Sequence, residues 1–150
     1  MKKIFGFTAV FAFLLIFSNN TFAQFRKIPS EVTDAFSQKY PGAKEVEWKD
    51  KLSAFSAGFN LDDKHYLASF SNKGEWQNTE QDVEESELPA VIKDSYSKTK
   101  YADWQINKVT KIELTGNVVQ YRIEIGSGDI KKRNLYFNTE GRLLKDKLTI

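Results

Sequence analysis

Two segments of the chain resemble each other at a spacing of about 60 residues. The first, residues 28–40, reads Ile-Pro-Ser-Glu-Val-Thr-Asp-Ala-Phe-Ser-Gln-Lys-Tyr, and the second, residues 88–101, begins Leu-Pro-Ala-Val-Ile-Lys-Asp-Ser-Tyr-Ser. A Phe-x-x-x-Gly pattern also occurs twice, at residues 70–74 and 137–141. Such self-similarity predicts two copies of one structural unit. The matching positions are Ile28, Pro29, Val32, Asp34, Phe36 and Ser37 against Leu88, Pro89, Ile92, Asp94, Tyr96 and Ser97.

Residues 1–23 have the pattern of a secretory signal peptide. Lys2 and Lys3 precede an apolar stretch, and Thr21-Phe22-Ala23 places small residues three and one positions before a cut ahead of Gln24. The alternative is a membrane anchor, but the apolar stretch of about 14 residues is shorter than the roughly 20 that a span needs. We therefore expect a periplasmic or secreted protein with no membrane span after signal removal.

Charge and cysteine content narrow the possible functions. Residues 24–87 carry a net charge of −5 and residues 88–150 a net charge of +5, so the mature chain is neutral overall. A neutral total argues against nucleic acid, which needs a concentrated basic surface. The chain has no cysteine, so its apolar core must stabilise the fold without disulfides. The difference in net charge between the two halves could favour a charged partner, although surface charge is often uneven without a function.

The hydrophobic periodicity predicts the same order of elements in each half. Val32, Phe36 and Tyr40 follow Pro29 at helical spacing, and a second helix is expected from Pro89. Beyond each helix the pattern alternates with a period of two, as half-buried antiparallel strands do. We expect strands around residues 45–49, 55–59, 66–70, 76–83, 104–114, 119–125 and 135–137 and from residue 143 onward. Residues 126–129 are expected to form a loop, and His65 a turn with Asp62-Asp63-Lys64.

The predicted fold class is therefore α+β, a tandem repeat of one helix plus about four antiparallel strands, with the helices packed on one face of the sheet or sheets. We expect one domain at residues 24–150, built of repeats at about 27–87 and 88–150. The acidic stretch at residues 80–87 would join them. The two sheets would meet edge to edge or lie side by side around a shared core.

Over residues 27–147 the chain resembles a known family. The Pro-x-x-Val-x-x-x-Phe-x-x-x-Tyr-Pro-Gly helix, the Val46-x-Trp48 strand and the Phe-x-x-x-Gly turn are similar to those of PepSY-like exported proteins with a beta-lactamase-inhibitor-like fold. The resemblance implies one continuous, curved sheet surface. It also implies a binding role, since related PepSY domains are thought to restrain peptidases and the inhibitor of similar fold covers an enzyme with its sheet face. No functional residue of those proteins matches a motif here.

The residues do not suggest a catalytic, cofactor or metal site. His65 is the only histidine, and a solvated histidine in a turn is commoner than a general base. A zinc site would need three or four ligands of His, Cys or carboxylate type. Asp62 and Asp63 lack the spacing of a calcium loop, and Glu45 and Glu47 are ordinary charges on a solvated strand. We therefore predict that the protein is not an enzyme and has no cofactor.

The predicted sheet leaves one face for a partner. The core face would carry Val46, Trp48, Phe55, Phe59, Tyr66, Phe70, Tyr121, Ile123 and Phe137, and the open face Glu45, Glu47, Lys49, Ser56, Asn60, His65, Leu67, Gln120, Arg122, Glu124 and Tyr136. Tyr136, Arg122 and His65 are the candidate partner-binding residues, because tyrosine and arginine are favoured at interfaces. The partner would be an envelope or extracellular protein such as a peptidase. Two alternatives remain: this face is simply solvated, or the protein carries a small apolar ligand between helix and sheet.

Overall fold

The computed structural model describes residues 26–128 and 131–149. The predicted signal peptide, residues 1–23, lies outside them. Within the described residues each of two α-helices precedes four β-strands. The elements are α1 (Ser30–Lys39), β1 (Lys44–Asp50), β2 (Ala54–Leu61), β3 (Lys64–Ser71), β4 (Trp76–Val83), α2 (Ala90–Ser97), β5 (Gln105–Leu114), β6 (Val118–Ser127), β7 (Lys131–Asn138) and β8 (Leu143–Thr149).

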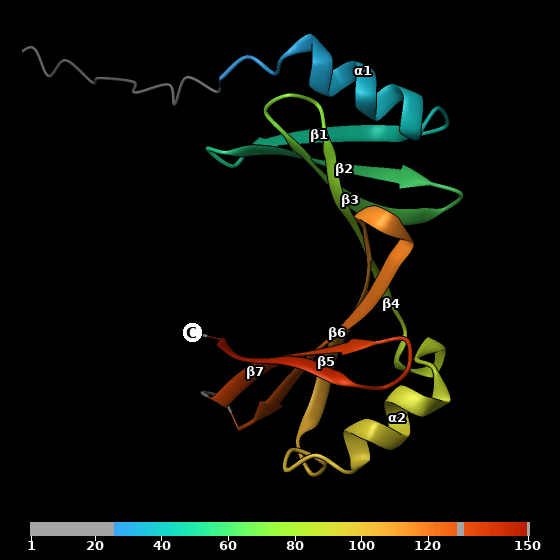
Figure 1. Ribbon diagram of the computed structural model, residues 1–150, viewed down its shortest axis with the longest axis vertical. Coiled ribbons are helices and arrows are strands. Elements are labelled where there is room, and N and C mark those ends of the chain that lie inside the picture. The colour runs from blue at the N-terminus through green and yellow to red at the C-terminus, as the bar shows by residue number, and fades with distance from the viewer. Residues whose placement is uncertain (1–25, 129–130, 150) are drawn as a thin grey trace, which may run out of the picture.

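All eight strands form one antiparallel sheet in the order β1 to β8. The two halves meet where residues 78–83 of β4 pair with residues 109–114 of β5. The edge-to-edge arrangement that the sequence allowed is therefore the one observed. The sheet curves strongly, and α1 and α2 lie near its two ends on the outer, convex side (Figure 1).

Both helices bury matched side chains against the sheet. Pro29 and Pro89 precede the first residues of α1 and α2, where a missing N–H group removes no helical hydrogen bond. The buried residues of α1 are Val32 and Phe36, and those of α2 are Ile92 and Tyr96. The α+β class is confirmed, whereas the tandem repeat itself stays a prediction.

Strand register places the two helices on the same face of the sheet. One transverse row of paired residues runs through Phe59, Tyr66, Gln81, Lys111, Tyr121 and Phe137. Phe59 belongs to the apolar cluster under α1, and Phe137 to the cluster under α2. Residues of one row share a face because side chains alternate along each strand. The prediction that both helices cover one face is confirmed.

The alternative of two sheets side by side around a shared core is not the one observed, because the described residues form two apolar clusters. At the junction of the halves, the convex face of β4 and β5 carries Thr79 opposite Glu113 and Gln81 opposite Lys111. Lys111 and Glu113 form an ion pair at 3.0 Å. These polar side chains cannot be buried cheaply without partners, so they separate the two clusters.

Three smaller expectations also differ from the structure. Val46 was assigned to the core but is 37% exposed, because a β-bulge between Lys44 and Glu47 changes the register of β1. His65 lies in β3 rather than in the preceding turn. The segment 126–127 continues β6 instead of forming a loop, and residue 129 of that expected loop lies outside the described residues.

Candidate functional site on the concave sheet face

The three predicted partner-binding residues lie on one transverse row of the concave face. Arg122 of β6 pairs with Tyr136 of β7. His65 of β3 precedes Tyr66, which pairs with Gln81, so His65 is level with Asp82 of β4. The sheet register therefore aligns residues from distant parts of the chain. The row comprises Asn60, His65, Asp82, Thr110, Arg122, Tyr136 and Lys145.

Arg122 already has a partner within the protein. Its two terminal nitrogens donate to the carboxylate oxygens of Glu80 at 3.3 and 2.8 Å, and one of them also donates to Thr110 Oγ1 at 3.2 Å. Burial alone would lower the pKa of Arg122, but the hydrogen bond and charge of Glu80, with a contribution from Tyr136, raise it. Arg122 thus stays charged and links β4 to β6 across β5. Much of its hydrogen-bonding capacity is used internally.

Tyr136 is the second member of the predicted set. It lies between two cationic side chains, since Arg122 is its neighbour on β6 and Lys145 its neighbour on β8. The Lys145 Nζ lies 5.8 Å from the centre of the Tyr136 ring. The ring is half-buried, so it is held in place while part of it remains open to contact.

His65 lies on the other side of the row, within the first half of the sheet. Its Nδ1 is 3.1 Å from Oδ1 of Asn60, and the side-chain amide of Asn60 donates to Glu45. The imidazole is exposed. The structure therefore brings Arg122 and Tyr136 into direct contact but separates His65 from them by β4 and β5.

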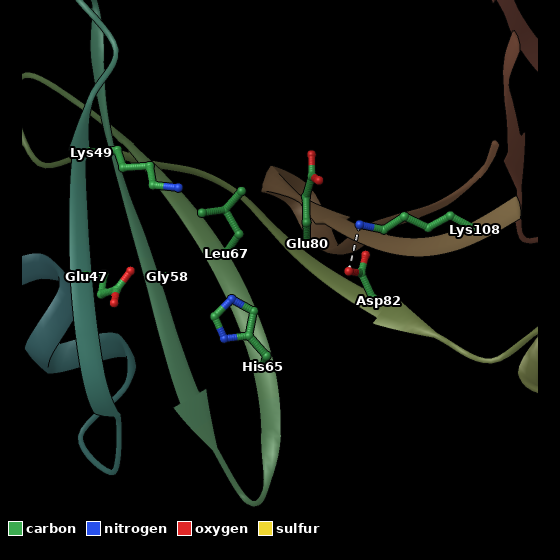
Figure 2. A pocket seen from close by; sticks show the side chains of 8 residues that line it. All are labelled: Glu47, Lys49, Gly58, His65, Leu67, Glu80, Asp82 and Lys108. Carbon is green, nitrogen blue, oxygen red and sulfur yellow. Dashed lines mark ion pairs between the residues drawn. The ribbon is translucent and has the colours of Figure 1, made fainter. Parts of the chain in front are cut away.

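Beside His65 the concave face contains a hollow of about 230 Å³ (Figure 2). Gly58 contributes no side chain to it, and Leu67 forms an apolar part of its lining. Lys108 reaches Asp82 at 2.8 Å, whereas Glu47 and Lys49 extend from β1 over the neighbouring strand (Figure 2). The lining residues are Glu47, Lys49, Gly58, His65, Leu67, Glu80, Asp82 and Lys108.

Sequence reasoning missed four of these lining residues: Gly58, Glu80, Asp82 and Lys108. Glu80 and Asp82 alternate in phase with Trp76, which packs against the core, so strict alternation would have placed them on the core face. A β-bulge between Trp76 and Asn78 shifts the register and turns them to the concave face. Gly58 lies in phase with Ser56 and Asn60 of the predicted open face but has no side chain to mark it. Lys108 follows a bulge between Ile106 and Lys108, which alternation does not predict.

The chemistry of this face suits recognition. The face carries two pairs of opposite charges, Lys108 with Asp82 and Arg122 with Glu80, and its polar groups surround small apolar areas, as at protein interfaces. Within residues 26–128 and 131–149 no three side chains of His, Cys, Asp or Glu converge to hold a metal ion. Neither described helix has the length and apolar character needed to cross a membrane.

The fold and this face together define an α+β protein whose curved antiparallel sheet is covered by helices on one side only. The chain belongs to the PepSY-like family, described as "Putative beta-lactamase-inhibitor-like, PepSY-like", which matches residues 53–145. The resemblance seen in the sequence is thereby confirmed. No curated protein sequence matches the chain.

Solved structures of the same fold come from Bacteroides species. A BLIP-like protein from Bacteroides fragilis superposes with a TM-score of 0.76 at 22% identity, covering 85% of this chain and 90% of that one. A DUF2874 family protein from Bacteroides ovatus has a TM-score of 0.76 at 25% identity, covering 82% and 89%. A structure from Bacteroides eggerthii, provisionally described as periplasmic, has a TM-score of 0.75 at 20% identity, covering 82% and 90%.

Proposed function

We propose that this protein is an exported, non-catalytic binding module that covers a protein partner with the concave face of its sheet, in the manner of an inhibitor. The observation that carries the proposal is that the helices cover one face of the sheet and leave the other open. Both helices pack on the convex face, while the row of polar and aromatic side chains on the concave face is exposed to solvent or half-buried, except for the buried Thr110. The family's inhibitor-like description agrees with this use.

An envelope or extracellular protein, such as a peptidase, is the proposed partner. The signal-like residues 1–23 direct the chain to that compartment, and one structure of the same fold is provisionally described as periplasmic. A convex part of the partner would enter the concavity, with Tyr136 and the hollow beside His65 as contact points. Arg122 would act mainly by holding Glu80 and Tyr136 in position.

The alternative, a carrier of a small apolar ligand between helix and sheet, has less support. The rings under α1 are in contact with one another: the centre of the Phe36 ring lies 5.0 Å from that of Phe59, and that of Tyr40 lies 4.6 Å from Phe59. Such distances are typical of packed aromatic pairs. They leave little room for a ligand at this place.

Photo-crosslinking in the native envelope tests the proposal. A photoreactive amino acid at position 67 or 136 reports on the concave face, because Leu67 already places a side chain in the hollow. The same group at Lys73, in the β3–β4 turn, is the control. We expect one defined crosslinked protein from the concave positions and none from the control. Replacing Gly58 with leucine should abolish capture because the new side chain fills the hollow. The fold should tolerate the change, since a Cβ at this position meets only ordinary van der Waals contacts, 3.5 Å from His65. Identical products from all three positions, or capture unaffected by Gly58→Leu, would refute a concave binding face.

A further inference from the structure

Three lysines lie together on the concave side of the last two strands. Lys145 and Lys147 of β8 pair with Tyr136 and Asn134 of β7, and Lys132 of β7 pairs with Thr149. All three lysines are exposed, and the register directs them to the same face. We refer to Lys132, Lys145 and Lys147 as the lysine cluster.

The cluster makes this end of the concave face positive. Within the described residues its members take part in none of the ion pairs, whereas Lys108 and Arg122, further along the same face, are matched by Asp82 and Glu80. Among residues 26–128 and 131–149, Glu124 is the one acidic side chain that the register places beside the cluster, because it pairs with Asn134. Asp146 faces the other side of the sheet and binds Arg133 there.

Protection of the sheet edge explains only part of this arrangement. Lysines on an edge strand discourage pairing with another sheet, and β8 is an edge strand. Lys132, however, belongs to β7, which has β6 and β8 on its two sides. Lys132 pairs with Thr149 and Lys147 with Asn134, so these two lysines are diagonal neighbours, about 7–8 Å apart. Their charges repel at this distance, and an anionic partner would offset that repulsion.

We propose that the lysine cluster and Tyr136 bind an acidic segment of the protein partner, an inference that rests on the proposed function. Carboxylates accept charge-assisted hydrogen bonds from lysine ammonium groups and can also accept from the Tyr136 hydroxyl. A uniform polyanion fits poorly, because Glu47, Glu80 and Asp82 line the other half of the concavity. The complementary partner is therefore a protein surface whose negative charge is confined to one end.

Peptide binding tests the inference directly. The probe is a fluorescent synthetic peptide of alternating glutamate and serine, and the control peptide has glutamine in place of glutamate. We expect the purified protein to bind the acidic peptide at low ionic strength and to lose affinity as salt is added. The double variant Lys145→Gln, Lys147→Gln should weaken binding about tenfold. The matched pair Lys51→Gln, Lys73→Gln makes the same charge change in the exposed β1–β2 and β3–β4 turns, and should change affinity less than about twofold.

Several outcomes would overturn the inference. One is that the glutamine peptide binds as tightly as the acidic peptide. Another is that the Lys51, Lys73 variant loses as much affinity as the Lys145, Lys147 variant. The third is that the protein binds phosphatidylglycerol vesicles as tightly as it binds the acidic peptide. Oligomerisation of the Lys145, Lys147 variant with unchanged peptide affinity would assign these lysines to edge protection instead. If position 67 still crosslinks to a partner while the acidic peptide fails to bind, this inference is wrong and the proposed function stands.

Discussion

Two glycines join hairpin turns to helices. Gly74, in the β3–β4 turn, has a φ of +81°, and a Cβ there would lie 2.4 Å from the carbonyl oxygen of Glu31 in α1. Gly141, in the β7–β8 turn, has a φ of +82°, and a Cβ would meet Ser95 Oγ at 2.6 Å and the Val91 carbonyl at 2.9 Å. At both positions the positive φ would strain a residue that has a Cβ, and that Cβ would also clash with the neighbouring helix. This accounts for the repeated Phe-x-x-x-Gly pattern in physical terms.

Alanine substitutions separate these two causes. Gly74→Ala and Gly141→Ala should each lower the free energy of unfolding by about 2–4 kcal/mol, because left-handed strain is added to a clash with a helix. Gly116→Ala is the control, since φ is +73° but nothing lies within 4 Å of the added Cβ. It should cost about 1–2 kcal/mol. Chemical denaturation measures all three, and equal losses would mean that contact with the helices is unimportant.

At the scale of elements, Asp146 ties the segment after α2 to the last two strands. Its carboxylate accepts from the Tyr101 hydroxyl at 2.8 Å and from Arg133 Nε at 2.5 Å. Partial burial would raise the pKa of Asp146, but the hydrogen bonds from Arg133 and Tyr101 outweigh this and lower it below its ordinary value. The ionised form therefore stabilises the folded protein.

The pH dependence of stability follows from the sign of this shift. Because the pKa of Asp146 is lower in the folded than in the unfolded chain, its contribution is complete above the unfolded value of about 4 and is lost as the pH falls through the folded value. Asp146→Asn should cost about 1 kcal/mol at pH 7. It should also lose less stability than the wild type between about pH 4 and pH 2, as thermal unfolding can measure. Parallel pH profiles would contradict this role.

The whole molecule is held together along the pairing of β4 with β5. Since the two apolar clusters do not merge, this pairing and the side chains above it couple the halves. On the concave side the Arg122–Glu80 ion pair crosses β5, with its side chains 24% and 25% exposed. The curvature that creates the concave face therefore depends on a polar junction.

A double-mutant cycle measures this coupling. Arg122→Gln should cost about 1–2 kcal/mol because it leaves the carboxylate of Glu80 half-buried without its cation. Adding Glu80→Gln should recover part of the loss, giving a coupling energy of about 1 kcal/mol. The exposed Asp94–Lys98 pair in and beside α2 is the control, with an expected coupling below about 0.5 kcal/mol. Coupling no larger than in the control would mean that Arg122 does not hold the halves together.

Much of this architecture could be predicted from local sequence patterns. Helical spacing after Pro29 and Pro89 and alternation in each half predicted both helices and eight strands, because these periods depend on neighbouring residues. The same alternation placed His65, Arg122 and Tyr136 on the open face, where the register puts them. Val46 and the end of β6 were wrong because a bulge and a strand extension depend on the partner strand.

The sequence by itself determined the class of fold, the inward aromatic residues and the two turn glycines, since each follows from local periodicity or backbone geometry. Tertiary structure alone decided that the halves share one sheet but not one core, and that Arg122 is engaged by Glu80. It also brought Gly58, Asp82 and Lys108 around one hollow and Lys132, Lys145 and Lys147 onto one face. These features come from strand pairing between residues far apart in the chain, which no local pattern encodes.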